Sequence, residues 1–150
     1  DDIYAYALSK VRNKFDADDI MQETFLKIYE NAKLYKPMGK GLAWIFTIET
    51  NVINRYFQIK SRKQLVDDET IFDSISDNES SSFEKFVQNE YLKKLFCILD
   101  NDEIEVISLH IVSDLKFREI AKVLGKPLST VLSKYNRAIK KIKKIAKEEK

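Results

Sequence analysis

The chain has 150 residues, of which 44% are hydrophobic, only 3 are glycine and only 2 are proline. The apolar content predicts a globular protein, and the scarcity of turn-forming residues favours an all-helical one. No run approaches the roughly twenty apolar residues of a membrane span, and no charged start followed by an apolar segment indicates secretion. A single cysteine, Cys97, and a single histidine, His110, exclude an internal disulfide framework and a zinc site. We expect Cys97 to be a buried structural thiol in a reducing cytoplasm.

The net charge of +2 is unevenly distributed. Residues 1–63 carry 11 basic and 8 acidic side chains, residues 64–99 carry 3 and 8, and residues 100–150 carry 12 and 8. Two basic ends therefore flank an acidic middle. Since a surface that neutralises phosphates must be cationic, this arrangement favours two DNA contacts made by one chain.

Before the acidic middle, the apolar spacing predicts three helices, over about residues 2–13, 16–31 and 42–62, with a loop at 35–41. We expect Asp16 to cap the second helix. That helix is predicted to bury four apolar side chains: Ile20, Phe25, Ile28 and Tyr29.

The segment 64–82 breaks the periodicity and is acidic and serine-rich, which is typical of a solvated linker. Its run of Asp67, Asp68 and Glu69 is much better explained by solvation than by a metal site. Beyond it, helices are predicted over about residues 82–99, 102–112, 116–124 and 128–147. Asp102 and Glu105 have the spacing of a capping box.

Three residues near the C-terminus have the spacing of a helix-turn-helix. Ala121 is small enough to let two helices approach, Gly125 can end the first helix in a left-handed conformation, and Val131 would be buried beneath the second. From Leu128 onward, apolar residues recur every three or four positions: Val131, Leu132, Tyr135, Ala138, Ile139, Ile142, Ile145 and Ala146. The second helix of such a motif commonly enters the DNA major groove.

The opposite face of this last helix is polar or cationic, with Ser129, Thr130, Ser133, Lys134, Arg137, Lys140, Lys141 and Lys144. An ordinary amphipathic surface helix has the same pattern, so the preceding turn is what favours DNA binding.

Both halves of the chain resemble the extracytoplasmic-function sigma factors, the small two-domain promoter-specificity subunits of bacterial RNA polymerase. In the first half, the resemblance rests on the segment DADDIMQETF (residues 16–25) and on Trp44, Ile48 and Asn51. In the second half, it extends from Leu99 to Ile142 and includes these residues: Glu105, Val106, Leu109, Glu119, Ile120, Ala121, Leu124, Gly125, Thr130, Val131, Ser133, Arg137 and Ala138. The resemblance implies a domain of region two at 1–63, a linker at 64–82 and a domain of region four at 83–150.

The resemblance also implies roles for three groups of residues. One face of the second helix, with Asp19, Gln22, Glu23 and Leu26, would bind the clamp helices of the polymerase beta-prime subunit. Without the resemblance, a solvated helix face is the simpler interpretation of these residues. The minus-ten element would be melted and held by Lys36, Lys40, Trp44, Asn51, Asn54, Arg55 and Gln58, although Trp44 taken alone favours a core position. The minus-thirty-five element would be read by Ser129, Thr130, Ser133, Lys134 and Arg137.

Some residues depart from the family pattern. Glu49 stands where a small residue is usual, and Arg55 where an acidic one is common, so the details of minus-ten recognition do not carry over. Ser129 and Leu132 replace a usual glycine and lysine at the start of the recognition helix, so the minus-thirty-five sequence cannot be inferred either.

The leading hypothesis is therefore a non-enzymatic sigma factor without cofactor or metal. Its expected partners are core polymerase, promoter DNA and an anti-sigma factor. We expect the protein to be cytoplasmic, and any attachment to the membrane to be through the anti-sigma factor. A stand-alone helix-turn-helix regulator is the alternative, and binding to core polymerase separates the two. An enzyme finds little support, since the sequence has no nucleophile–base pair, glycine-rich phosphate loop or metal cluster.

Overall fold

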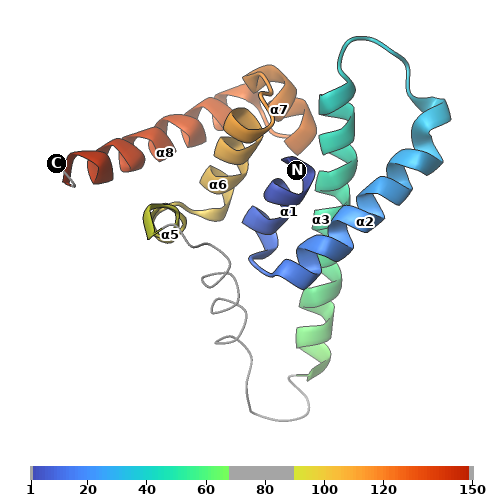
Figure 1. Ribbon diagram of the computed structural model, residues 1–150, viewed down its shortest axis with the longest axis horizontal. Helices are drawn as coiled ribbons and strands as arrows, with labels where there is room; N and C mark the ends of the chain where they lie inside the picture. The colour runs from blue at the N-terminus through green and yellow to red at the C-terminus, as the bar shows by residue number, and fades with distance from the viewer. Residues whose placement is uncertain (1, 68–89, 149–150) are drawn as a thin grey trace.

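The computed structural model describes residues 2–67 and 90–148 (Figure 1). Every regular element in these two ranges is helical, which confirms the predicted fold class. The elements are α1 (Asp2–Val11), α2 (Lys14–Asn31), the 3₁₀ turn η1 (Ala32–Leu34), α3 (Gly41–Asp67), α5 (Glu90–Ile98), α6 (Asn101–Ile107), the π-type turn η2 (Ser108–Val112), α7 (Phe117–Leu124) and α8 (Leu128–Glu148). We call α1–α3 the N-terminal lobe and α5–α8 the C-terminal lobe.

The long helix α3 continues to Asp67, past its predicted end near residue 62. The intervening residues Lys63, Gln64, Leu65 and Val66 contain neither glycine nor proline, so nothing in them stops a helix. Most of the predicted linker at 64–82, its boundary with the second domain, and the start of the helix predicted at 82–99 lie outside the described residues.

Helix α2 begins earlier than predicted, because Asn13 and not Asp16 caps it. The Asn13 backbone is extended, and its side-chain oxygen accepts hydrogen bonds from the backbone N–H groups of Phe15, at 2.9 Å, and Asp16, at 3.2 Å. The Asp16 carboxylate instead accepts a hydrogen bond of 2.6 Å from the Tyr56 hydroxyl of α3. Asp16 thus ties α2 to α3.

The buried stripe of α2 also differs from the prediction. Ala17, Ile20 and Thr24 are buried, at the helical spacing of three and four. Phe25 and Tyr29, which we expected in the core, are 54% and 82% exposed. Residues 25 and 29 share a face with each other, but that face is turned away from α1 and α3, so apolar spacing alone misassigned it.

In the C-terminal lobe, the capping box of α6 lies two residues before the predicted one. Asp100 accepts a 2.8 Å hydrogen bond from the backbone N–H of Glu103, and Glu103 accepts one of 2.9 Å from that of Asp100. The helix therefore starts at Asn101, and Asp102 is left free to bond elsewhere. Cys97 of α5 is exposed, contrary to the prediction of a buried thiol.

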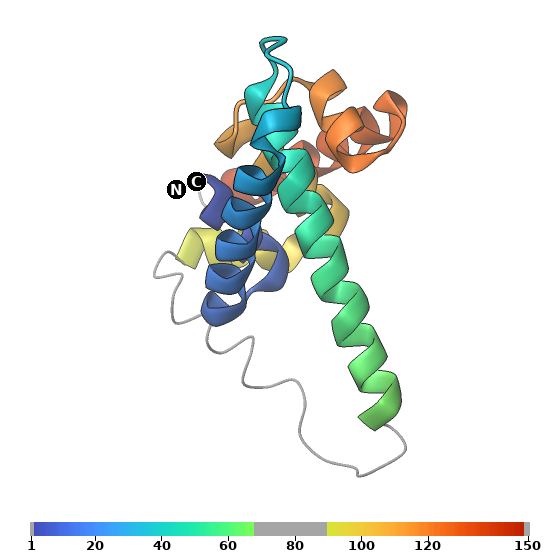
Figure 2. The same cartoon turned by 90° about the vertical axis from the view of Figure 1, so that its right-hand side faces the viewer.

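The two lobes pack against each other around one continuous core. Helix α1 lies between α3 and the helices of the C-terminal lobe, while α7 packs on the N-terminal half of α3 (Figure 1). The far half of α3 extends past the other helices (Figure 2). The shared core contains these buried side chains: Tyr6, Ala7, Leu8, Val11, Ala17, Ile20, Phe46, Val52, Ile53, Val106, Leu109, Leu115, Ile120, Val123 and Val131.

Candidate nucleic-acid interface

The predicted helix-turn-helix is present as α7, a short turn and α8. Gly125 ends α7 with a φ of 61°, the left-handed conformation that favours glycine, and the N–H of Lys126 donates to the Ala121 carbonyl at 3.0 Å. Ala121 packs against the core while half-buried, and Val131 is fully buried below the start of α8. The turn chemistry predicted from the sequence is confirmed.

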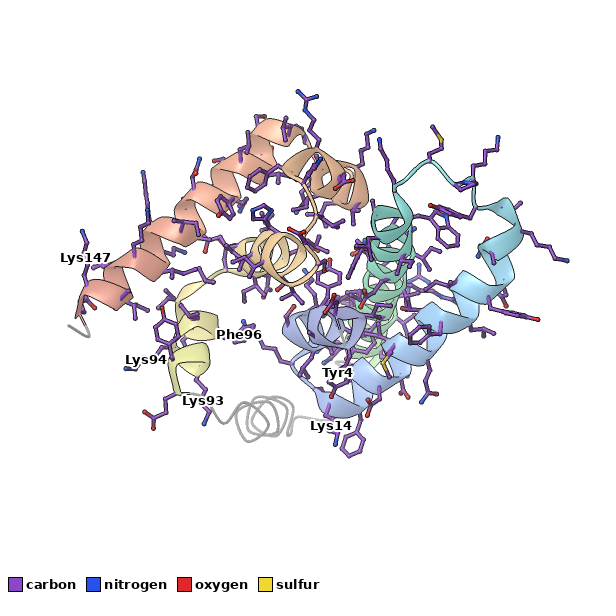
Figure 3. The ribbon with its side chains drawn as sticks, turned by 45° about the horizontal axis from the view of Figure 1, so that its top comes forward. Tyr4, Lys14, Lys93, Lys94, Phe96 and Lys147 are labelled. Atoms are coloured by element: carbon purple, nitrogen blue, oxygen red, sulfur yellow. The ribbon has the colours of Figure 1, made fainter. Side chains whose placement is uncertain are left out.

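The polar residues predicted on α8 do not all point the same way. Ser129, Ser133 and Arg137 are exposed, whereas Thr130 and Lys134 are half-buried. The apolar face is likewise narrower than predicted, because Leu132 and Ala146 are exposed. Further along the exposed side lie Lys140, Lys143, Lys144 and, at the C-terminal end of the helix in Figure 3, Lys147. This side of α8 offers hydroxyl groups followed by a row of cations.

The inward cations of the C-terminal lobe meet a cluster of acids, here called the acidic end of α6: Asp100, Asp102, Glu103 and Glu105. The Lys134 ammonium lies 3.1 Å from Asp102, and the Lys126 ammonium lies 3.3 Å from the other oxygen of the same carboxylate. The hydrogen bond from Lys134 and the charge of Lys126 lower the pKa of Asp102, against the opposing effect of its burial.

The rest of this network reaches into the N-terminal lobe. Glu105, which is nearly buried, lies 3.6 Å from Lys126 and 3.1 Å from Lys10 of α1. Glu103 is fully buried and lies 2.7 Å from Lys141 of α8. We did not predict these pairs. Lys134 and Lys141 are seven residues apart and hence on one helical face, a spacing that could have suggested a common acidic neighbour.

The predicted polymerase face of α2 is mostly exposed. Asp19, Gln22 and Leu26 are exposed, but Glu23 is half-buried and faces α3, where it lies 3.6 Å from the Arg55 guanidinium. The exposed Phe25 and Tyr29 add apolar area next to Leu26. The face is therefore more apolar than the sequence led us to expect, and a patch of this kind marks an interaction surface.

Three of the residues predicted to hold the minus-ten element share a groove with Glu23. This groove between α2 and α3 has a volume of about 360 Å³, and Trp44, Asn51 and Arg55 line it. The Trp44 ring is half-buried and packs against Tyr35, with 4.8 Å between the ring centres. One part of the ring is therefore covered by protein and the other part is accessible to solvent. The other four predicted residues are exposed outside the groove lining: Lys36, Lys40, Asn54 and Gln58.

Hydrogen bonds between polar side chains, here called the polar seam, join the two lobes. The Tyr6 hydroxyl lies 3.2 Å from the hydroxyl of Thr50 and donates to the Glu105 carboxylate, also at 3.2 Å. Ser108 donates to Ser9 at 3.3 Å. At the other end of α1, Arg12 lies 5.9 Å from the ring centre of Phe96, which projects from α5 toward α1 (Figure 3).

Glu49 of α3 lies beside this seam. Its side chain is fully buried, and burial raises its pKa to about 9 against the smaller opposing effect of the backbone N–H of Ala7. The carboxyl is therefore protonated and neutral near physiological pH. The sequence showed only that Glu49 stands where a small residue is usual, not that it is buried.

Two further features of the described residues concern metal binding and membrane insertion. Within residues 2–67 and 90–148, no group of three or more histidine, cysteine or acidic side chains is placed to hold a metal ion. None of the described helices is both long enough and apolar enough to cross a lipid bilayer.

Comparison with known proteins accounts for both lobes. Residues 1–63 match the family model of Sigma-70 region 2, and residues 90–142 match that of Sigma-70, region 4. The RNA polymerase sigma factor SigV of Bacillus subtilis is 27% identical over 139 residues, which cover 93% of this chain and 81% of that protein. The ECF RNA polymerase sigma factor EcfG of Rhodopseudomonas palustris is 26% identical over 138 residues, or 92% of this chain and 75% of that protein.

A solved structure shares the fold of the whole chain. It is the sigma factor RpoE of Bartonella quintana, crystallised with the anti-sigma factor NepR, and it superposes with a TM-score of 0.77 at 22% identity over 99% of this chain and 91% of that one. Three findings lead to one assignment: the helix-turn-helix, the two family matches in sequence order, and relatives that align over nearly the full length of the chain. The chain belongs to the extracytoplasmic-function sigma factors, the promoter-specificity subunits of bacterial RNA polymerase.

Proposed function

We propose that the exposed face of α8 reads the minus-thirty-five element, while the groove between α2 and α3 and the loop before α3 hold the opened minus-ten strand. The exposed hydroxyl and cationic row after the left-handed turn at Gly125 is the observation that carries this proposal. Ser129, Thr130, Ser133 and Arg137 are the residues that we assign to the duplex. Lys36, Lys40, Trp44, Asn51, Asn54, Arg55 and Gln58 are those that we assign to the opened strand.

The groove suits an unpaired strand on chemical grounds. Trp44 presents part of its ring, Asn51 offers an amide that can donate and accept hydrogen bonds, and Arg55 supplies positive charge. The exposed Lys36 and Lys40 lie on the loop that leads into α3 and would attract the phosphate backbone. The chain itself performs no covalent chemistry in this proposal, and it acts beside polymerase and DNA in the cytoplasm.

Replacing Arg137 with alanine should weaken binding to promoter duplex and make it less dependent on salt. Each lost phosphate contact lowers the slope of log K against log salt by about 0.9. Fluorescence anisotropy of a labelled duplex in a salt series measures both quantities. Lys93→Ala removes a cation from α5, outside the helix-turn-helix, and should change neither. If Arg137→Ala binds like the parent, α8 does not lie on the DNA.

The exposed face of α2 is proposed to bind the clamp helices of the polymerase beta-prime subunit. Asp19, Gln22 and Leu26 offer a charge, an amide and an apolar side chain, and Glu23 borders them. Phe25 and Tyr29 enlarge the apolar part of the same surface. An anti-sigma factor, such as the one bound by the Bartonella relative, is proposed as a second protein partner.

Replacing Gln22 and Glu23 together with alanine should abolish binding to core polymerase and transcription, with helicity unchanged, because neither side chain is in the core. Glu23 also pairs with Arg55, so Arg55→Ala is the matched control: it removes the same ion pair without touching the α2 face. We expect the control to bind core polymerase normally in a pull-down. Full binding by the Gln22/Glu23 variant would favour a stand-alone regulator.

A further inference from the structure

Among the cations of the helix-turn-helix, Lys134 is set apart by its surroundings. Its side chain is only 19% exposed, with the ammonium 3.1 Å from Asp102 and 3.9 Å from Asp100. Arg137, three residues further along α8, is exposed and has no ion pair among the described residues. Within one turn of the recognition helix, Lys134 is thus paired with carboxylates, whereas Arg137 is exposed to solvent.

The orientation of Lys134 follows from how α8 packs. Lys134, Ala138 and Lys141 recur at the spacing of four and three residues that puts side chains on one face of a helix. Ala138 is fully buried against a cluster that includes Ile104 of α6, and Lys141 bonds the buried Glu103 of the same helix. Lys134 belongs to this inward face.

The charges around Lys134 balance. The four carboxylates of the acidic end of α6 are Asp100, Asp102, Glu103 and Glu105, and four ammonium groups lie within 3.9 Å of them: those of Lys10, Lys126, Lys134 and Lys141. Phosphate binding gains free energy because a protein cation replaces a condensed counterion on the DNA. If Lys134 left this cluster for a phosphate, its four carboxylates would share three ammonium groups and would need a counterion from solution, so the net release would be close to zero.

We propose that Asp102 withholds Lys134 from DNA, so that Lys134 adds nothing to phosphate binding as long as this carboxylate is present. Asp102 then lowers the affinity of the helix-turn-helix for DNA, and it does so independently of the DNA sequence. This inference rests on the proposed placement of α8 on DNA. It also changes the role of Lys134 from a DNA contact, as the sequence suggested, to the partner of an internal acid.

The test is a double-mutant cycle on the full chain with a random-sequence duplex of about 20 base pairs, since the phosphate contribution does not depend on sequence. Asp102→Asn should free Lys134 and raise the magnitude of the salt slope by about 0.9, which is a three- to four-fold steeper loss of affinity between about 50 and 200 mM salt. Adding Lys134→Ala to Asp102→Asn should return the slope to the parent value.

Two further variants control for net charge and for folding. Asp2→Asn makes the same change of charge in the first turn of α1, at an exposed position without an assigned role, and should leave the slope unaltered. Asp102→Ser removes the same carboxylate but leaves a smaller uncharged side chain, and should behave as Asp102→Asn does. Helicity measured by circular dichroism identifies a variant that has lost its fold.

Two outcomes would overturn the inference. In one, Asp102→Asn and Asp102→Ser leave the slope at the parent value, which would show that Asp102 does not keep Lys134 from DNA; a lower slope in Lys134→Ala alone would then show that Lys134 already contacts DNA. In the other, Asp102→Asn raises the slope and Lys134→Ala does not reverse it. Arg137→Ala, measured beside them, separates the two proposals: an unchanged slope there contradicts the placement of α8 on DNA, whatever Asp102 does.

Discussion

Glu49→Gln should stabilise the folded chain by up to about 3 kcal/mol near pH 7. Burial raises the pKa of Glu49 from 4.5 to about 9, so folding at neutral pH requires this carboxyl to take up a proton that it does not hold in the unfolded chain. A buried glutamine brings amide hydrogens that also need hydrogen-bond acceptors, which makes this value an upper bound. Urea denaturation of both proteins, at several pH values, measures the difference.

The pH dependence is the sharper part of this prediction. A pKa that is raised in the folded state gives stability that is complete below the unfolded pKa and is lost as the pH rises toward the folded one. The parent should therefore lose stability between about pH 4.5 and about pH 9, and the glutamine variant should lose less over that range. Glu148→Gln, at an exposed site on α8, serves as the control. Parallel pH profiles for the parent and Glu49→Gln would mean that Glu49 is ionised in the folded protein.

Phe46→Ala should cost about 3–5 kcal/mol, the range for removing a buried aromatic ring. Phe46 is 1% exposed and meets the ring of Tyr6 edge to face, with 5.8 Å between the ring centres. Because its core includes Ile120 and Val131 of the helix-turn-helix, the loss should affect both lobes in one transition.

Denaturation can be followed in two ways, by the fluorescence of Trp44, the single tryptophan, and by helicity. The midpoints of the two curves should coincide and should fall together in Phe46→Ala. Phe15→Ala provides the comparison, since Phe15 is 74% exposed and its loss should change stability little. Separate midpoints in the parent would show that the lobes unfold independently and that the shared core contributes little.

The sequence predicted what depends on local chemistry. Gly125 marks the end of α7 because few other residues adopt the left-handed conformation there, and the periodic apolar residues identify α8. The helix-turn-helix is therefore recognisable from a few residues within one short segment. For the N-terminal lobe, the basic charge indicated only a DNA contact, and the resemblance to a family supplied the roles of individual residues.

What depends on tertiary contacts was not predictable in this way. Phe25 and Tyr29 have the spacing of core residues, yet the packing of α2 on α1 and α3 leaves them in solvent. Lys134 looks like any other cation of a recognition helix until the acids of α6 are placed beside it. For Glu49, the sequence showed only a departure from the family pattern, and the helices packed around it show that it is buried.

The place of α1 between the lobes has a consequence for the order in which the protein forms. Tyr6 donates to Glu105, which is made 99 residues later, and Ser9 meets Ser108 across the same separation. During translation, α1 emerges from the ribosome well before α6 exists, so its buried face has only half of its eventual neighbours. Contacts so distant along the chain form late in folding. Helix α1 is therefore synthesised before α6 but is completed only after it, and until then the nascent chain leaves the side of Tyr6 that faces Glu105 uncovered.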